Sequence, residues 1–69
     1  MADSVYSVSE IVGSSPDGIE RAIAAALDRA RQTLRNLDWF QVKEIRGRLG
    51  SNGEVESYQV TLKLGFRME

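Results

Sequence analysis

Trp39, the single tryptophan of the chain, is the residue whose type and position most clearly suggest a functional role. Trp39 precedes Phe40 at the start of a stretch that is patterned as a long strand. Neighbouring side chains of a strand point to opposite faces of a sheet, so these two rings cannot enter one core. Phe40 and Val42 make the apolar face, which leaves the indole on a polar face. A large flat ring in such a place favours a flat partner, either a ligand or another subunit.

Catalytic and metal-binding residue types are scarce in this sequence. It has no His and no Cys, which excludes a disulfide and a zinc site of the Cys/His kind. No nucleophile stands with a base, and Glu44 by itself is a poor general acid or base. We therefore expect a binding protein rather than an enzyme.

Charge and hydropathy limit the partners. The formal net charge is −1, from 9 basic and 10 acidic residues, and this gives no general attraction to nucleic acid or to an anionic membrane. The first residues have neither the basic region nor the apolar run of a signal peptide. No stretch approaches the ~18 apolar residues of a membrane span. The expectation is a soluble cytoplasmic protein with no nucleic-acid and no membrane partner.

A strand and a long helix are predicted for the first half of the chain. Residues 5–12 are rich in β-branched side chains and roughly alternate, and Gly13 is expected to end this strand. Residues 14–17 are typical of a helix start, with Ser at the N-cap and Pro in the first turn. The helix is predicted over about residues 16–36, because apolar residues recur every three or four positions. They are Ile19, Ala22, Ile23, Ala26, Leu27, Ala30, Leu34 and Leu37.

Two long strands joined by a hairpin are predicted for the second half. They span about residues 39–49 and 54–68, and Asn52-Gly53 suits the positive φ angles of a tight turn. The last strand alternates cleanly, and one of its faces should cover the helix. The residues of that face are Tyr58, Val60, Leu62, Leu64 and Phe66, and the opposite face carries Ser57, Gln59, Thr61, Lys63 and Arg67.

The alternation of the middle strand slips by one position. Its apolar side chains change parity between positions 42 and 45. One extra residue near positions 43–44, a β-bulge, restores the phase and puts Arg46 on the face of the tryptophan. Pairing back from the hairpin then places Gln59 roughly opposite Glu44 and near this arginine.

Together these elements predict an α+β fold of β-α-β-β order, in which a three-stranded antiparallel sheet wraps around one helix. Residues 1–69 make a single domain. Strands of ten or more residues overhang one helix and curl around it. The other sheet face, with Trp39, would be uncovered in a monomer, and a chain of this size buries only roughly 60% of its unfolded surface. We therefore expect an oligomer.

The chain resembles the dodecins, and the resemblance covers nearly all of it. The matching segments are Glu10-Ile11-Val12-Gly13-Ser14-Ser15-Pro16-Asp17-Gly18, then Leu37-Asp38-Trp39-Phe40 with Val42 and Glu44-Ile45-Arg46-Gly47, and finally Tyr58-Gln59-Val60 to Gly65-Phe66-Arg67. In combination they are closer to the bacterial than to the archaeal members. The resemblance implies a single dodecin-like domain and a hollow homododecamer of cubic symmetry. It also implies flavin (FMN, FAD or riboflavin) held as dimers between subunits, for storage and photoprotection rather than turnover.

The same resemblance assigns roles to three residues. Trp39 matches the tryptophan on which the isoalloxazine ring stacks, and Gln59 matches the glutamine that hydrogen-bonds the polar edge of that ring. Arg46 stands where bacterial members have an arginine near the ligand. Indole is electron-rich and isoalloxazine electron-poor, an amide both donates and accepts, and a guanidinium can meet a phosphate bidentately. Some bacterial members also bind coenzyme A, for which no residue pattern here identifies a site.

Two other functions fit parts of the pattern. Trp39 could simply pack in the interface of a structural oligomer that holds no flavin. An exposed sheet face with an aromatic ring and basic groups could instead bind single-stranded nucleic acid. The net negative charge and the presence of only one outward aromatic residue count against this last alternative.

Overall fold

The computed structural model describes residues 3–68 of the chain. Its elements are strand β1 (Tyr6–Ser15), helix α1 (Ile19–Thr33), strand β2 (Leu37–Leu49) and strand β3 (Val55–Arg67). All three strands form one antiparallel sheet in the order β1-β3-β2, so the last strand lies in the middle. The predicted α+β class and the β-α-β-β order are confirmed.

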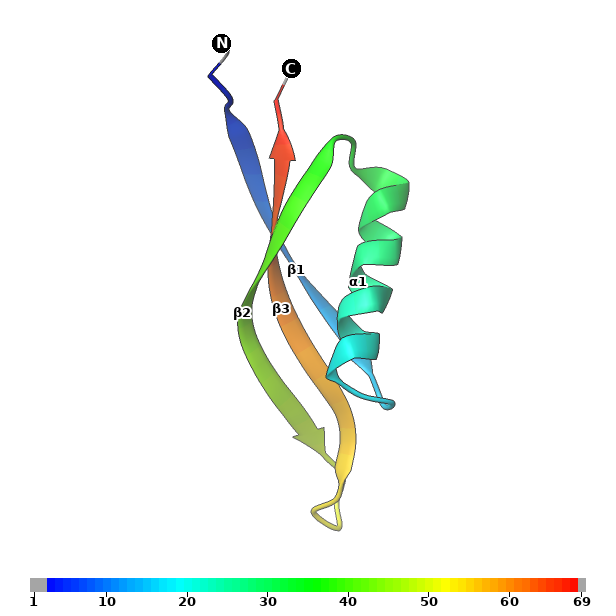
Figure 1. The fold of residues 1–69 in the computed structure, drawn as a ribbon. Coiled ribbons are helices and arrows are strands. Elements are labelled where there is room, and N and C mark those ends of the chain that lie inside the picture. Colours follow the sequence, from blue (N-terminus) through cyan, green and yellow to red (C-terminus); the bar gives the residue numbers. More distant parts are fainter. Residues whose placement is uncertain (1–2, 69) are drawn as a thin grey trace.

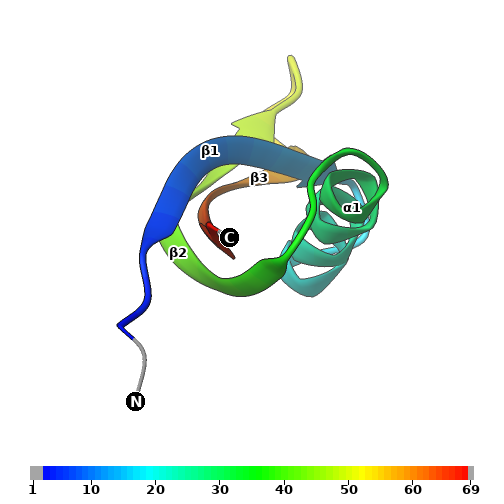
Figure 2. The ribbon, with the colours of Figure 1, turned by 90° about the horizontal axis from the view of Figure 1, so that it is seen from above.

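The sheet is much longer than the helix that it carries. β2 and β3 have 13 residues each, which corresponds to roughly 43 Å of strand, whereas the 15 residues of α1 span roughly 22 Å. The sheet therefore projects beyond the helix at the β2–β3 hairpin (Figure 1). Seen along its length, it curls into an arc with the helix at one side (Figure 2). The predicted overhang and wrapping are confirmed.

The core lies between α1 and the inner face of the sheet, the face that points toward the helix. α1 packs mainly on β1 and β3. Three alanines on one side of the helix let its backbone come close to the sheet, because they carry no side chain beyond Cβ. The buried apolar residues are Ala22, Ala26, Ala30, Val60, Leu62 and Leu64, with Ile11, Ile23, Leu27, Leu34 and Leu37 packed against them.

Gly13 lies within β1 and does not end it, so the prediction for this position is wrong. A Cβ atom on Gly13 would overlap the carbonyl oxygen of Ala22 and lie 2.8 Å from the Cβ atom of Ala26. The missing side chain lets the strand pass directly beneath the helix, and the strand continues to Ser15. This glycine serves a close approach of two backbones rather than a turn.

The helix begins at Ile19 rather than at the predicted Pro16. Its N-cap is Gly18, whose φ of 143° is a conformation that other residue types rarely adopt. The predicted serine cap is absent, because Ser15 still belongs to β1. The Ser15 Oγ atom instead accepts a hydrogen bond from the Asp17 amide (3.0 Å) in the connecting turn.

At its other end the helix stops at Thr33 and not at the predicted Asn36. Leu34 is already extended, with φ −114° and ψ 143°. Asn36 has a φ of 63°, a left-handed conformation that Asn tolerates better than most residues. This reversal starts β2 at Leu37, two residues earlier than predicted.

The predicted β-bulge in β2 is present. The register between β2 and β3 shifts between Val42 and Glu44, so Lys43 is the extra residue. Phe40, Val42 and Ile45 consequently share the inner face, since they lie opposite Leu64, Leu62 and Val60. This assignment of faces is confirmed.

A single chain leaves much of this inner face exposed. Phe40, Val42 and Ile45, which we call the β2 stripe, are 45%, 38% and 51% exposed. The accessible surface of the chain is 5203 Å², whereas a compact monomer of this mass is expected to expose roughly 4,300 Å². The radius of gyration is 14.4 Å against an expected value of about 11 Å.

Within residues 3–68, no helix combines the length and the apolar character needed to cross a membrane.

Candidate functional site

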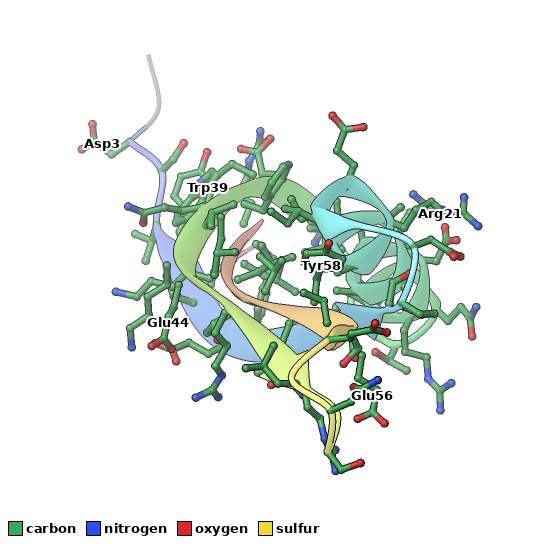
Figure 3. All side chains as sticks on the ribbon, turned by 90° about the horizontal axis from the view of Figure 1, so that it is seen from below. Asp3, Arg21, Trp39, Glu44, Glu56 and Tyr58 are labelled. Atoms are coloured by element: carbon green, nitrogen blue, oxygen red, sulfur yellow. The ribbon has the colours of Figure 1, made fainter. Side chains whose placement is uncertain are left out.

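Trp39 lies on the outer face of the sheet, the face that points away from the helix. It is opposite Gly65 of β3, and the indole rests on the backbone of this glycine. A Cβ atom on Gly65 would lie within 2.6 Å of the indole atoms Cε2, Cζ2 and Cδ2. Figure 3 shows Trp39 outside the curled sheet and Tyr58 inside it, toward the helix. The predicted position of the tryptophan on the outer face is confirmed.

Groups from both edge strands surround this indole. The Tyr6 ring of β1 has its centroid 6.1 Å from that of the indole, with an angle of 50° between the ring planes. The Tyr6 hydroxyl donates a hydrogen bond to Oδ2 of Asp38 (2.7 Å). Nη2 of Arg67 lies 3.9 Å from the same carboxylate oxygen. The tryptophan is therefore 40% exposed rather than fully uncovered.

The sequence analysis missed Tyr6, Asp38 and Gly65 as neighbours of Trp39. Their meeting depends on β3 lying between β1 and β2, which the residue pattern does not reveal. One signal was available, because a glycine inside a long strand often marks a place that another group approaches closely. Gly65 interrupts the outward series of β3 in this way.

Arg46 and Gln59 lie directly opposite each other on β2 and β3. The prediction that placed Gln59 opposite Glu44 is wrong by two residues, since Glu44 lies opposite Thr61. Two departures close to the hairpin cause this difference. Leu49 pairs with Val55 rather than with Glu54, and Glu56 is an extra residue of β3 between Val55 and Ser57. The prediction that Gln59 is near Arg46 is confirmed.

One chain does not bring Trp39 together with this Arg46–Gln59 pair. Trp39 is opposite Gly65, and Gln59 stands six residues earlier on β3. Six residues of extended strand cover roughly 20 Å. Within one chain, the indole and the pair therefore lie at two separate places on the outer face.

Exposed ion pairs occupy the surface near these groups. The Lys43 Nζ atom lies 2.9 Å from a Glu10 carboxylate oxygen, joining β2 to β1 across β3. The Arg48 Nε atom lies 3.2 Å from a carboxylate oxygen of Glu56. Exposed pairs of this kind contribute little stability. Among the residues that the structure describes, no three or more His, Cys, Asp or Glu side chains converge as metal ligands would.

A hollow of about 490 Å³ has a lining that does not include Trp39. It lies between β1 and the helix, where Gly13, Ala25 and Arg29 are among its lining residues. Because β1 is an edge strand, its outer backbone edge is unpaired along this groove. A smaller hollow of about 170 Å³ lies beside the end of β2 that carries the tryptophan, with Leu27 and Phe40 in its lining.

Comparison with known families agrees with this architecture. The family model described as Dodecin matches residues 5–69. The chain belongs to the dodecin family.

Individual members of the family are similar over nearly their whole length. The dodecin of Thermus thermophilus is 62% identical over 65 residues, which cover 94% of this chain and 93% of that protein. The structure of the dodecin from Streptomyces coelicolor has a TM-score of 0.91 and 52% identity, and the match covers 100% of this chain and 97% of that one.

A more distant member is the calcium dodecin of Mycobacterium tuberculosis. It is 35% identical over 65 residues, covering 94% of this chain and 90% of that protein. Its crystal structure, with a TM-score of 0.82 and a match that covers 96% of this chain and 93% of that one, is described as containing a novel calcium-binding site. That site is a property of the mycobacterial protein.

Proposed function

We propose that the chain binds flavin on the indole of Trp39, between subunits of a hollow homododecamer, and stores and photoprotects it as stacked dimers. The main observation behind the proposal is the way in which the indole lies on the sheet. One ring face lies on the Gly65 backbone, while 40% of the side chain is exposed. The exposed area must belong to the opposite ring face and the ring edges, and these are what a stacked ligand needs. Membership in the dodecin family supports flavin as the ligand.

Binding and protection follow from the chemistry of the indole. It is the most electron-rich ring among the side chains, and it stacks favourably on the electron-poor isoalloxazine. In the stacked pair, the indole can transfer an electron to the photoexcited flavin and then take it back, which quenches the excited state without net reaction. Membership in the dodecin family supports binding and storage rather than turnover as the role.

The distances within one chain support a site shared between copies. In the proposed site, Trp39 of one chain stacks on the ring, while Gln59 and Arg46 of another chain contact its polar edge and its phosphate-bearing tail. The separation of roughly 20 Å along β3 supports contributions from two chains rather than from one. The phosphate contact favours FMN, and FAD and riboflavin share the ring.

The exposed apolar surface supports assembly into a homo-oligomer. The β2 stripe lies half-exposed beside the helix. Covering the 45% of Phe40 that is exposed removes roughly 70–110 Å² from water. A small domain without disulfides gains stability most readily by association. We propose the dodecamer as the form in which the site is complete, and the cytoplasm as its location.

The test is a fluorescence titration of flavin-free protein with FMN. We expect strong quenching of flavin emission by the parent. Trp39→Ala should weaken binding roughly 5- to 150-fold, because stacking contributes about 1–3 kcal/mol per ring. Light scattering should show the same assembly for both proteins.

Other outcomes would favour the alternatives. An alanine variant that binds FMN as tightly as the parent would show that Trp39 is not the stacking residue. A stable oligomer that quenches no flavin would favour a purely structural protein. Affinity for single-stranded RNA that falls steeply with salt would favour the nucleic-acid interpretation.

A further inference from the structure

We propose that Tyr6 and Asp38 are positioning residues for the flavin-stacking indole. Together with Gly65 they form what we call the indole clamp, which holds Trp39 flat against the outer face of the sheet. The inference rests on the proposed function for its purpose. The clamp itself belongs to the flavin-free protein and can be measured without ligand.

The first part of the clamp is a hydrogen bond that fastens an irregular backbone. The register of β2 shifts between Leu37 and Trp39, so Asp38 is an extra residue in a β-bulge. A bulged residue has no partner in the strand ladder, which leaves the adjacent backbone less constrained. The Tyr6 hydroxyl donates to the Asp38 carboxylate at 2.7 Å and so ties β2 to β1 across the intervening strand.

The second part of the clamp is contact with the indole itself. The Tyr6 ring lies 6.1 Å from the indole at a tilted angle of 50°, a separation and orientation at which aromatic pairs attract. Tyr6 therefore contacts the tryptophan with its ring and holds the preceding residue with its hydroxyl. One side chain restrains both the indole and the backbone that carries it.

The third part is the surface on which the indole lies. The described residues include positive φ values at Gly18 and Gly53, but not at Gly65. The backbone at Gly65 thus accepts other residue types, and it is the indole that requires the absence of a Cβ atom. A methyl group at this position would lift the ring from the sheet.

This arrangement matters because a stacking ring must be oriented before the ligand arrives. An indole that is free to rotate loses conformational entropy when a flavin fixes it, and that loss weakens binding. An indole already held in place avoids most of this cost. Releasing the clamp is expected to weaken FMN binding about 2- to 12-fold without removing the stacking residue.

The experiment compares Tyr6→Phe with Tyr58→Phe in the flavin-free, assembled protein. Trp39 is the single tryptophan, so the anisotropy decay of tryptophan emission reports on this indole alone. Tyr6→Phe removes one hydroxyl and should increase the fast component of the decay. Tyr58→Phe removes the hydroxyl of the other tyrosine, which lies on the inner face of β3, and should leave the decay unchanged.

Two further variants separate the parts of the clamp. Asp38→Ala should increase the fast component at least as much as Tyr6→Phe, since it also removes the contact with Arg67. The double variant should be no worse than Asp38→Ala alone, because both substitutions remove the same hydrogen bond. Gly65→Ala should lower FMN affinity by less than Trp39→Ala, because the stacking ring is displaced but not removed. In a Trp39→Ala background the Gly65 substitution should have no further effect.

The outcomes distinguish the clamp from the proposed function. Unchanged anisotropy and unchanged FMN affinity in Tyr6→Phe would overturn the clamp, even when the parent binds flavin. A faster decay in Tyr6→Phe, together with a parent that does not bind FMN, would support the clamp and overturn the flavin site. A faster decay with weaker FMN binding and an unchanged assembly is the expected result.

Discussion

Gln59 and Trp39 contact different parts of a flavin in the proposed site. Substituting them should therefore weaken flavin binding in different ways. Gln59→Ala leaves polar groups of the ring edge unpaired in a partly desolvated site, which costs about 1–3 kcal/mol. The loss should be equal for FMN, riboflavin and lumiflavin, because all three share the ring. Quenching titrations with the three ligands measure it.

A matched control exists for this substitution. Gln41 also lies on the outer face, opposite Lys63. Gln41→Ala should leave all three affinities within twofold of the parent value. An effect of Gln59→Ala confined to FMN would contradict its assignment to the ring edge.

Arg46 is expected to favour flavins that carry a phosphate group. Arg46→Ala should weaken FMN roughly 5- to 10-fold and riboflavin less than twofold, since a charged hydrogen bond to phosphate is lost in a partly exposed place. The preference of the parent for FMN over riboflavin should shrink with added salt, because screening weakens the attraction.

Arg48 is the control for Arg46, because it is the next outward residue of β2 and already pairs with Glu56 at 3.2 Å. Arg48→Ala should change neither affinity. Equal loss of FMN and riboflavin in Arg46→Ala would make Arg46 a structural residue and leave the phosphate to other groups.

At the residue scale, the sequence predicted the sheet face of a side chain better than the side chains that it contacts. The period-two alternation places Trp39 on the outer face, and the change of parity after Val42 reveals the bulge at Lys43. Both signals are local. The contact of Tyr6 with the indole joins residues 33 positions apart through the order of the strands, and no local pattern carries that information.

At the scale of elements, the packing of α1 on β1 depends on Gly13. Gly13→Ala would press a methyl group against the helix backbone at Ala22. Overpacking of this kind typically costs about 1–3 kcal/mol, and we expect the upper end because a backbone cannot rotate away as a side chain can. Thermal and urea unfolding of the variant should measure a clear loss of stability.

Gly47 provides the control, because a Cβ atom there would meet only the Ser57 carbonyl oxygen at an ordinary 3.7 Å. Gly47→Ala should leave stability unchanged or raise it slightly, since alanine has less freedom in the unfolded chain. Equal stability of the Gly13 and Gly47 variants would show that the close approach at β1 is not a stabilising feature.

Long periodic elements were predictable, and their ends were not. The apolar stripe of the helix and the alternation of β3 each extend over many residues, and the central residues of both form the core. The run from Ser14 to Gly18 suits either a helix cap or a turn before a helix. The strand was expected to end at Gly13, whereas it passes under the helix and reaches Ser15, which leaves capping to Gly18. Such tertiary packing decides between two local choices of similar energy.

At the scale of the whole molecule, the exposed β2 stripe is expected to lie in a subunit interface. Ile45→Asp would bury a charge there and should dissociate the assembly, because an unpaired buried carboxylate is costly. Ile45→Val keeps the apolar character and should assemble normally. Size-exclusion chromatography with light scattering distinguishes the two, and an Ile45→Asp variant of unchanged mass would place the interface elsewhere.

The last prediction is that folding and assembly are one process. The chain exposes more surface than a compact monomer of its size, and the six buried apolar residues of the described part of the chain include three alanines, which bury little area. An isolated chain should therefore be marginally stable at best. Light scattering should report roughly twelve times the chain mass of 7.7 kDa, and the melting temperature should rise with protein concentration, because association stabilises only the folded state. A well-folded monomer at micromolar concentration would contradict this. If the melting temperature does depend on concentration, the flavin site and the fold share one requirement, since each is completed only by a neighbouring copy.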